Sequence, residues 1–343
     1  MDQLSSCAAT SSIKKHLIFL LYLYVSPISM KTIDLTTIEE VFSELSPANI
    51  RWDEPFLSKY IFRGQANESW QLIPKAIRKG TKFYTDDRTR KGDPLNQRTV
   101  RDQIELEFNL IYQFIEYSNL SGLYTPNDHS ILKEFEFTNF IDYLNQLGRG
   151  TIPWPAKEYY PILAMAQHYN LPTCLLDFTL NPFVALYFGA KSSLQLRRYN
   201  DSKFSVYAVN VDLPMLTIGD HKAWWPEEKE LFASRMKSRT RYQFIQSTSY
   251  SNQNQTAQKG VFLGLVRENR NSNGPVEILS VEDYINPVEK DDEFILKFNI
   301  EKKIAGRILK ILSKYSIDAL HLFPGLYGIS EFIKEKELWA PKW

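Results

Sequence analysis

Short apolar runs, each bounded by turn residues or charges, recur along this chain and alternate with segments of helical periodicity. Runs of about four to eight residues are typical of buried strands, whereas apolar residues three and four positions apart indicate one face of a helix. The chain has 343 residues, 43% of them hydrophobic, which is enough to bury a sizeable core. The pattern predicts an α+β fold, a single domain with a mixed central sheet and flanking helices.

The individual elements are predicted from these local patterns. Polar, irregular stretches are expected to be loops, namely residues 217–258 and the charged connector from Lys79 to Arg101. The segment from Ile317 to Phe332 is expected to give a strand, a turn and a final helical piece. The predicted strands are 59–63, 174–178, 204–211, 260–263 and 294–298, and the predicted helices are a short capped one after residue 36, 101–117, 155–169, one starting at 181–182, and 302–313.

The N-terminal segment differs from the rest of the chain. Lys14 and Lys15 precede an apolar run from His16 to Val25, which imitates a signal peptide but is too short to span a bilayer. The alternative is that translation starts at Met30. Residues 1–29 are therefore expected to be an N-terminal extension, dispensable or disordered, and residues 30–57 a helical lead-in to the main domain.

Composition limits which cell compartment and which partners are expected. The 41 Lys and Arg residues oppose 40 Asp and Glu residues, so the net charge of +1 gives no general attraction to nucleic acid or membrane. Only Cys7 and Cys174 are present, which excludes a disulfide scaffold and fits a reducing cytosol. The five histidines lack metal-binding spacing. We therefore expect a cytoplasmic protein without a metal site or a stable membrane association.

The end of the first apolar run carries the clearest candidate for ligand binding. Arg63 offers a planar fork for phosphate or carboxylate, and Gln65 adds an amide that both donates and accepts. Gly64 is expected in a turn, where it would let a ligand approach the backbone closely. The structural alternative is a salt bridge from Arg63 and a plain turn at Gly64.

A second group of candidates lies around residues 167–182. His168 is a candidate acid, base or hydrogen-bond donor, with a satisfied structural histidine as the alternative. Asp177 closes a buried apolar run, and a carboxylate there must find donors, for which Arg63 and Thr173 are available. The sequence leaves two roles open for Asp177, helix capping and the orientation of an active site.

Two further motifs lie later in the chain. Gln258 precedes a predicted strand, so its side chain either reaches the same rim as Arg63 or belongs to an ordinary connection into the strand. Ser247-Thr248-Ser249 is a hydroxyl-rich stretch of the kind that is common in loops, and it could also hold a nicotinamide amide.

Several of these blocks, in this order, resemble the FRG domain. The resemblance covers most of the chain, so an FRG domain is expected at residues 58–334, followed by a C-terminal tail at 335–343. FRG proteins tend to occur in bacterial and phage-related settings. The matching blocks are Phe62-Arg63-Gly64-Gln65 with Trp70, Leu72, Pro74 and Arg78, then Gln167-His168-Tyr169, Leu175 to Phe188, Gln258 to Phe262, and Leu322 to Gly328.

The order of elements is more distantly similar to ADP-ribosyltransferases of the Arg–Ser–Glu type. The resemblance implies NAD as substrate and Arg63-Gly64 as its phosphate anchor, while Gln258 stands where the catalytic glutamate is expected. An acid elsewhere would have to replace that glutamate, and the candidates are Asp177, Glu105, Glu107 and Glu331. The implied catalytic residues are Arg63, His168 and Asp177, and the implied NAD-binding residues are Arg63, Gly64, Gln65, Tyr169, Thr179 and Gln258.

These resemblances imply an intracellular effector, an NAD-using ADP-ribosyltransferase-like toxin in antiphage defence or a toxin-antitoxin system. Its expected partners are NAD, a protein or nucleic acid target, and a cognate antitoxin. The alternative is a non-enzymatic module that senses a nucleotide or a phage protein, which the absent glutamate favours. A nuclease fits less well, because no carboxylate–lysine or histidine–metal arrangement is evident.

Overall fold

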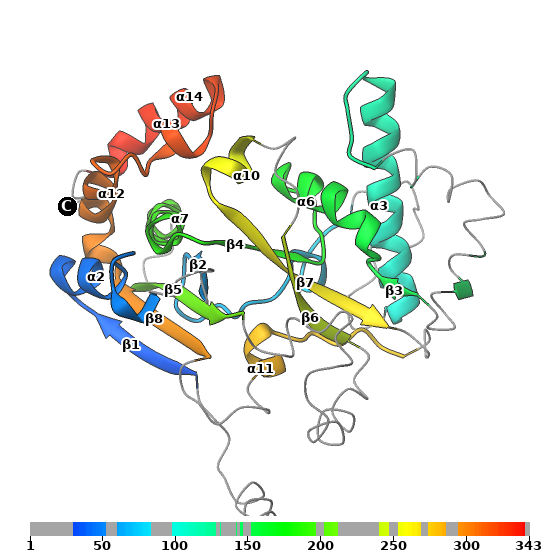
Figure 1. Ribbon diagram of the computed structural model, residues 1–343, viewed down its shortest axis with the longest axis horizontal. Coiled ribbons are helices and arrows are strands. Elements are labelled where there is room, and N and C mark those ends of the chain that lie inside the picture. Colours follow the sequence, from blue (N-terminus) through cyan, green and yellow to red (C-terminus); the bar gives the residue numbers. More distant parts are fainter. Residues whose placement is uncertain are drawn as a thin grey trace, which may run out of the picture.

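The computed structural model describes residues 30–52, 60–83, 98–127, 131, 142, 145–146, 152–196, 202–211, 240–246, 253–268, 274–285 and 294–339. Within these residues a mixed eight-stranded sheet carries helices on both faces, which confirms the expected α+β class (Figure 1). The strands are β1 (Lys31–Leu35), β2 (Tyr60–Gln65), β3 (Pro153–Trp154), β4 (Leu175–Thr179), β5 (Lys203–Asn210), β6 (Thr240–Ile245), β7 (Gly260–Glu268) and β8 (Ile295–Glu301).

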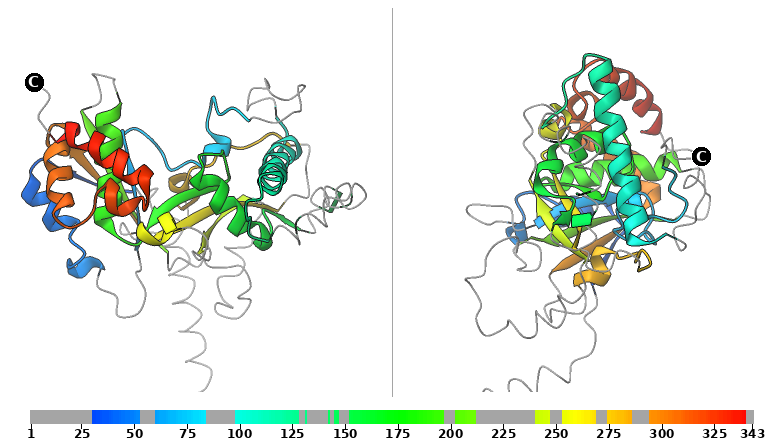
Figure 2. Two further views of the ribbon diagram at one scale, coloured as in Figure 1. Left: turned by 90° about the horizontal axis from the view of Figure 1, so that it is seen from above. Right: turned by 90° about the vertical axis from the view of Figure 1, so that its right-hand side faces the viewer.

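The helices form groups at the two ends of the sheet. Helix α3 stands near β3, whereas α12, α13 and α14 gather near β1 and β8 (Figure 2). No helix among the described residues has the length and apolarity needed to cross a membrane. The α-helices are α2 (Ile38–Glu44), α3 (Val100–Leu120), α6 (Tyr160–His168), α7 (Pro182–Gln195), α10 (Gln253–Ala257), α11 (Val281–Ile285), α12 (Ala305–Ser313), α13 (Ala319–Leu322) and α14 (Leu326–Glu335), and the 3-10 turns are η1 (Ile50–Trp52), η2 (Lys75–Ile77), η4 (Lys157–Tyr159), η5 (Lys302–Ile304) and η6 (Lys336–Leu338).

The order of the strands brings the predicted site segments together. The sheet runs β1-β8-β5-β2-β4-β7, with β1 parallel to β8 and every other pair antiparallel. Strands β4 and β6 both pair with the middle of β7, so they lie on its opposite edges, and β3 continues the edge occupied by β4. Strands β2, β4 and β7, which carry or adjoin Arg63, Asp177 and Gln258, are therefore neighbours.

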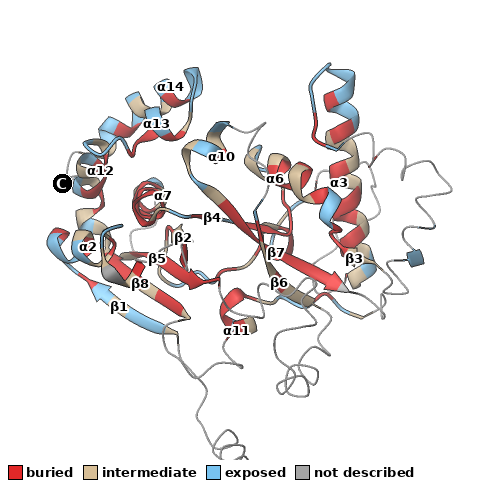
Figure 3. Ribbon diagram, in the orientation of Figure 1, coloured by how far each residue is buried: buried red, intermediate tan, exposed pale blue. Residues whose placement is uncertain are grey.

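Both faces of the central strands are buried. In β2, Ile61 packs into one core with α3, α6, β4 and β7, whereas Tyr60 and Phe62 pack into a second core with α2, α7, β8 and α12. We call these the β4–β7 core and the α7–α12 core. A strand covered on both faces has no solvated side, and β5 is accordingly buried along nearly its whole length (Figure 3). Its polar Ser205 is satisfied by donating to Asn299 Oδ1 at 2.9 Å.

Local sequence explains where the helices begin. Thr37 caps α2 in a reciprocal capping box with Glu40, as the hydroxyl residues there predict. Asn181 caps α7 by accepting from the backbone N–H of Phe183, and Pro182 occupies the first turn, where its missing N–H costs nothing. The predicted helices at 101–117 and 155–169 are confirmed as α3 and as η4 with α6.

Four predictions of secondary structure are wrong. The segment 30–57, expected to be a helical lead-in, begins with strand β1, which pairs with β8 and extends the sheet. Strand β2 continues through Gly64 and Gln65, so the expected turn at Gly64 does not exist. The stretch 217–258, expected to be irregular, contains β6 and α10 among its described residues, because β7 provides a long edge for β6. The strand expected after Ile317 is helix α13, since Asp318 caps it by accepting from the N–H of His321.

Candidate functional site

Arg63 and Asp177 meet across neighbouring strands. The register pairs Phe62 of β2 with Thr179 of β4, which places Arg63 beside the Asp177 main chain. Nη1 of Arg63 donates to the carbonyl oxygen of Asp177 at 2.6 Å and lies 3.7 Å from its carboxylate Oδ2. The arginine side chain is 16% exposed and the aspartate side chain 54% exposed. A mostly buried guanidinium therefore lies next to a carboxylate that solvent reaches.

The Arg63 guanidinium keeps unused hydrogen-bonding capacity. Its Nε is buried and has no hydrogen-bond partner among the described residues. Burial lowers the pKa of Arg63, and the nearby Asp177 charge opposes this shift. A buried donor without a partner is costly. The terminal Nη2 makes no hydrogen bond with a described residue and is not among the buried unpartnered atoms, so it is the nitrogen that a ligand oxygen can reach.

The loop before β4 holds the Asp177 carboxylate in place. Gln167, near the end of α6, donates from Nε2 to Asp177 Oδ2 at 2.8 Å. The Thr173 hydroxyl in turn donates to Gln167 Oε1 at 2.7 Å. This chain of hydrogen bonds fixes the orientation of the Gln167 amide and leaves Asp177 Oδ1 for other contacts.

His168 lies at the end of α6 beside this chain. The amide nitrogen of Asn254, in α10, lies within hydrogen-bond distance of His168 Nε2. The contact suits a tautomer in which Nε2 accepts from this amide. Burial lowers the pKa of His168, and the Asp177 charge acts in the opposite direction. The following Tyr169 is exposed and packs edge-on against the His168 ring.

Two further cations, both on or next to η2, lie close to Arg63 and Asp177. Lys75 donates from Nζ to the carbonyl and the side-chain oxygen of Asn170, at 2.7 and 2.6 Å. Arg78 donates from Nε to the Ile73 carbonyl at 2.7 Å. Burial and then the Arg63 charge lower the pKa of Arg78 to about 10, while burial and then the Arg78 charge lower that of Lys75. We call Arg63, Lys75, Arg78 and Asp177 the cation cluster.

The segment that leads into η2 is held by buried side chains. Gln65, expected to bind a cofactor, is 5% exposed and donates to the Gln71 carbonyl at 3.4 Å, so it positions this segment. Both carboxylate oxygens of Glu282 accept from the Leu72 N–H at 3.1 Å. The Tyr207 hydroxyl donates to the Trp70 carbonyl at 2.8 Å, and Lys297 donates to the Glu68 carbonyl. The backbone of residues 68–72 is thus fixed from four directions.

Gly64 makes a close approach, but to a helix. A Cβ built at Gly64 would lie 2.1 Å from the carbonyl oxygen of Ala185 and 2.4 Å from the nitrogen of Gly189. Helix α7 therefore fills the space beside Gly64 in which the sequence placed a ligand. The glycine is required by packing between β2 and α7.

Thr179 and Gln258 form a connection of their own at the end of β4. The Thr179 hydroxyl donates to the Gln258 carbonyl at 2.7 Å and accepts from the Asn181 N–H. The Gln258 amide donates to the Leu322 carbonyl of α13 at 3.1 Å. Among the described residues no contact joins Gln258 directly to Arg63. Within the described residues, Gln258 is connected towards Arg63 and Asp177 through Thr179 and through α10, which bears the partner of His168.

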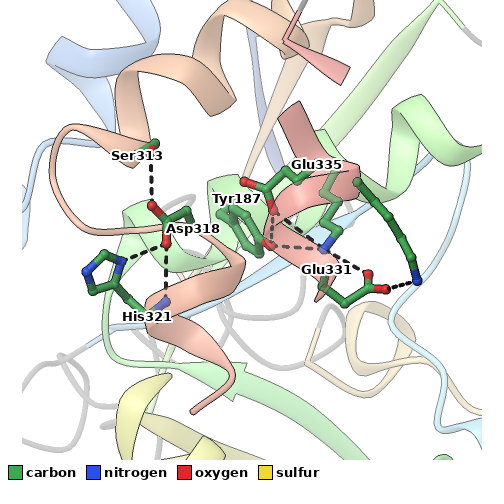
Figure 4. Close-up of polar contacts among 8 residues, drawn as sticks. Tyr187, Ser313, Asp318, His321, Glu331 and Glu335 are labelled. Atoms are coloured by element: carbon green, nitrogen blue, oxygen red, sulfur yellow. Dashed lines mark hydrogen bonds and ion pairs between the residues drawn. The ribbon is translucent and has the colours of Figure 1, made fainter. Parts of the chain in front are cut away.

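Of the four acids that might replace the missing glutamate, Asp177 contacts Arg63, whereas the other three form ion pairs elsewhere in the described residues. Glu107 is buried, pairs with Arg267 at 3.0 Å and accepts from Trp154 Nε1 at 2.9 Å. Glu105 pairs with Arg101 on the exposed side of α3. Glu331 of α14 pairs with Lys334 of the same helix and with Lys191 of α7, beside the buried Glu335 and Tyr187 (Figure 4).

Sequence reasoning brought Arg63, His168 and Asp177 to one region and missed the role of η2. Lys75 and Arg78 are separated by one helical turn and follow Pro74, a spacing that places two cations close together. This spacing is a weak indication of a binding site, because isolated basic residues are usually solvated. Ser247-Thr248-Ser249 lies outside the described residues.

Comparison with known proteins gives one match to a family model, over less than half of the chain. The family model of the FRG domain matches residues 58–198. The match includes the cation cluster and His168, and the later blocks around Gln258 and Leu322 lie beyond it. No curated protein and no solved structure matches the chain.

Proposed function

We propose that this protein binds NAD through its phosphate groups at the cation cluster and that Asp177 assists cleavage of the nicotinamide–ribose bond. The observation that carries the proposal is the pairing of Arg63, largely buried and with an unpartnered Nε, with the half-exposed Asp177 carboxylate. A guanidinium fork matches phosphate oxygens, and a buried one binds them with little competition from water.

The same arrangement suits the chemistry of glycosidic cleavage. As the bond between nicotinamide and C1′ breaks, its electron pair leaves with nicotinamide and positive charge develops on the ribose. A carboxylate held beside the anchored phosphates would stabilise that charge, and Gln167 already orients the Asp177 carboxylate. An oxygen or nitrogen nucleophile on a protein or nucleic acid target then forms the new bond to C1′ and loses a proton.

The cellular role belongs to the same proposal. A toxin that acts in antiphage defence or in a toxin-antitoxin system is what the FRG resemblance implies, and that resemblance alone supports it. The chemistry can be tested without settling the cellular setting.

The test is nicotinamide release from NAD by the purified protein, with and without a cell lysate as a source of targets. We expect Asp177→Asn to lower kcat by roughly a hundredfold with little change in KM, because it removes transition-state stabilisation. Arg63→Lys should mainly raise KM, since it keeps the charge but loses the fork. Asp34→Asn is a matched control, because Asp34 is also a strand aspartate, 57% exposed and paired with a cation, Lys203. If the wild-type protein releases no nicotinamide from NAD, either alone or with lysate, the enzymatic proposal is ruled out.

One observation favours a second candidate, a nucleotide-binding module without turnover. The ADP-ribosyltransferase resemblance expects a catalytic glutamate at Gln258, and the amide of Gln258 donates to the Leu322 carbonyl instead of facing Arg63. NAD binding measured by calorimetry, with no nicotinamide released over hours, would select this candidate, and Arg63→Lys should then weaken binding while Asp34→Asn leaves it unchanged.

A further inference from the structure

We propose that Lys75 and Arg78 form a second anion position beside Arg63, so that the cation cluster takes a diphosphate in preference to a monophosphate. The inference rests on the proposed function for the nucleotide identity of the ligand. The diphosphate preference itself can be tested without any nucleotide.

The η2 turn is attached directly to the loop that orients Asp177. The backbone N–H of Ala76 donates to the Thr173 carbonyl at 3.1 Å, and Lys75 Nζ bonds Asn170. Thr173 is the residue whose hydroxyl holds Gln167, which in turn holds Asp177. Lys75 and Arg78 are therefore fixed relative to the Arg63–Asp177 pair by main-chain as well as side-chain hydrogen bonds.

Arg78 is oriented yet keeps donors for a ligand. Within the part of the chain that the structure describes, its guanidinium makes a single hydrogen bond, from Nε to the Ile73 carbonyl. That bond fixes the Nε end of the guanidinium and leaves the two terminal nitrogens available. Arg63 is similar, since its Nη1 is used on the Asp177 carbonyl, while its Nη2 makes no hydrogen bond with a described residue and is not among the buried unpartnered atoms.

Charge balance explains why an anion is needed. The charge of one carboxylate, Asp177, acts on three cations, Arg63, Lys75 and Arg78. Burial lowers the pKa of all three, the Arg63 charge adds to the shift of Arg78, and the Arg78 charge adds to that of Lys75. Like charges held together in a partly buried place destabilise the empty protein. A diphosphate would offset the excess positive charge more fully than a monophosphate.

The arrangement of the two arginines favours two phosphates over one. Arg63 projects from β2 and Arg78 follows η2, so each guanidinium has its own backbone support. Each planar fork suits the oxygens of one phosphate, and Lys75 adds a point charge. The two phosphates of a diphosphate are joined by one bridging oxygen, so both can be bound at once.

The experiment is titration calorimetry with inorganic pyrophosphate and inorganic phosphate at low ionic strength. We expect pyrophosphate to bind at least about tenfold more tightly than phosphate, a ratio that Arg78→Met and Lys75→Met each reduce severalfold while phosphate binding changes little. Lys79→Met is the matched control, because Lys79 is exposed, lies next to Arg78 and makes no hydrogen bond or ion pair with a described residue. Far-UV circular dichroism and a thermal midpoint establish that each variant is folded.

The outcomes separate this inference from the proposed function. Equal affinity for pyrophosphate and phosphate, or an unchanged ratio in both folded variants, overturns the second anion position even if NAD is cleaved. Pyrophosphate preference that depends on Arg78, without NAD binding or turnover, supports the second anion position and rejects the proposed function. If only one of the two variants folds, the ratio of its pyrophosphate affinity to its phosphate affinity decides whether the second anion position exists.

Discussion

At residue 64 the absence of a side chain allows α7 to lie directly against β2. The carbonyl of Ala185 and the nitrogen of Gly189 occupy the space that a methyl group would need. Both are backbone atoms of a buried helix and cannot move as a flexible side chain would. The glycine of the Phe-Arg-Gly-Gln motif therefore determines where α7 sits, and α7 in turn covers the strand that bears Arg63.

We predict that Gly64→Ala lowers the free energy of unfolding by about 1–3 kcal/mol or more, through overpacking. Urea denaturation followed by circular dichroism measures the change. Gly122→Ala is the comparison, because a Cβ at Gly122 meets nothing within 4 Å and only its positive φ of 67° resists alanine, a cost of roughly 1 kcal/mol. A Gly64→Ala variant as stable as Gly122→Ala would contradict the packing argument.

The residues of the site were easier to predict than their roles. Arg63 was selected for its guanidinium fork at the end of a strand, and Asp177 because a carboxylate that closes a buried apolar run needs donors. The structure brings the two together. The roles of Gly64 and Gln65 depend on α7 and on the Gln71 carbonyl, which are tertiary partners that the local sequence does not contain.

At the scale of elements, α14 is attached to α7 by a buried polar contact. The Tyr187 hydroxyl donates to Glu335 Oε2 at 2.6 Å, and Lys191 Nζ lies 3.5 Å from the same oxygen (Figure 4). Burial raises the pKa of Glu335 and of Tyr187. The carboxylate thus depends on these two donors for its stability within the protein.

We predict that Tyr187→Phe destabilises the protein by about 1.5–3 kcal/mol, because it removes a hydrogen bond to a buried carboxylate. The thermal midpoint should fall accordingly. Tyr169→Phe removes an exposed hydroxyl instead and should leave the midpoint unchanged. Equal midpoints for the two variants would mean that the contact between α7 and α14 contributes no stability.

Strands flanked by clear turn signals were predicted well, and elements defined by distant partners were not. The runs at β4 and β8 are apolar, since both faces are covered, so sequence alone located them. Strand β6 has a mixed sequence and owes its conformation to pairing with β7. In α13 the capping residue Asp318 prevailed over an apolar pattern that was taken for a strand.

For the whole molecule, the two cores share strands β2 and β5. Alternate residues of β2 point into different cores, and Tyr207 and Ala208 of β5 do the same. Neither core can lose its contacts without disturbing strands on which the other depends. The sheet should therefore unfold as one cooperative unit.

We predict a single unfolding transition that core substitutions in either half shift together. Leu45→Ala in the α7–α12 core and Ile162→Ala in the β4–β7 core should each lower stability by about 2–5 kcal/mol. Circular dichroism and tryptophan fluorescence should report the same midpoint in each variant. Two separated transitions, with each substitution moving only one, would show that the halves unfold independently.

The four contacts that fix residues 68–72 have a consequence for engineering. Gln65, Tyr207, Glu282 and Lys297 hold that backbone without using the side chains of Lys75 or Arg78. Substitutions at positions 75 and 78 therefore change the charge presented to a ligand while the contacts that hold the backbone of residues 68–72 are kept. A combinatorial library at these two positions would compare ligand preferences on one constant scaffold.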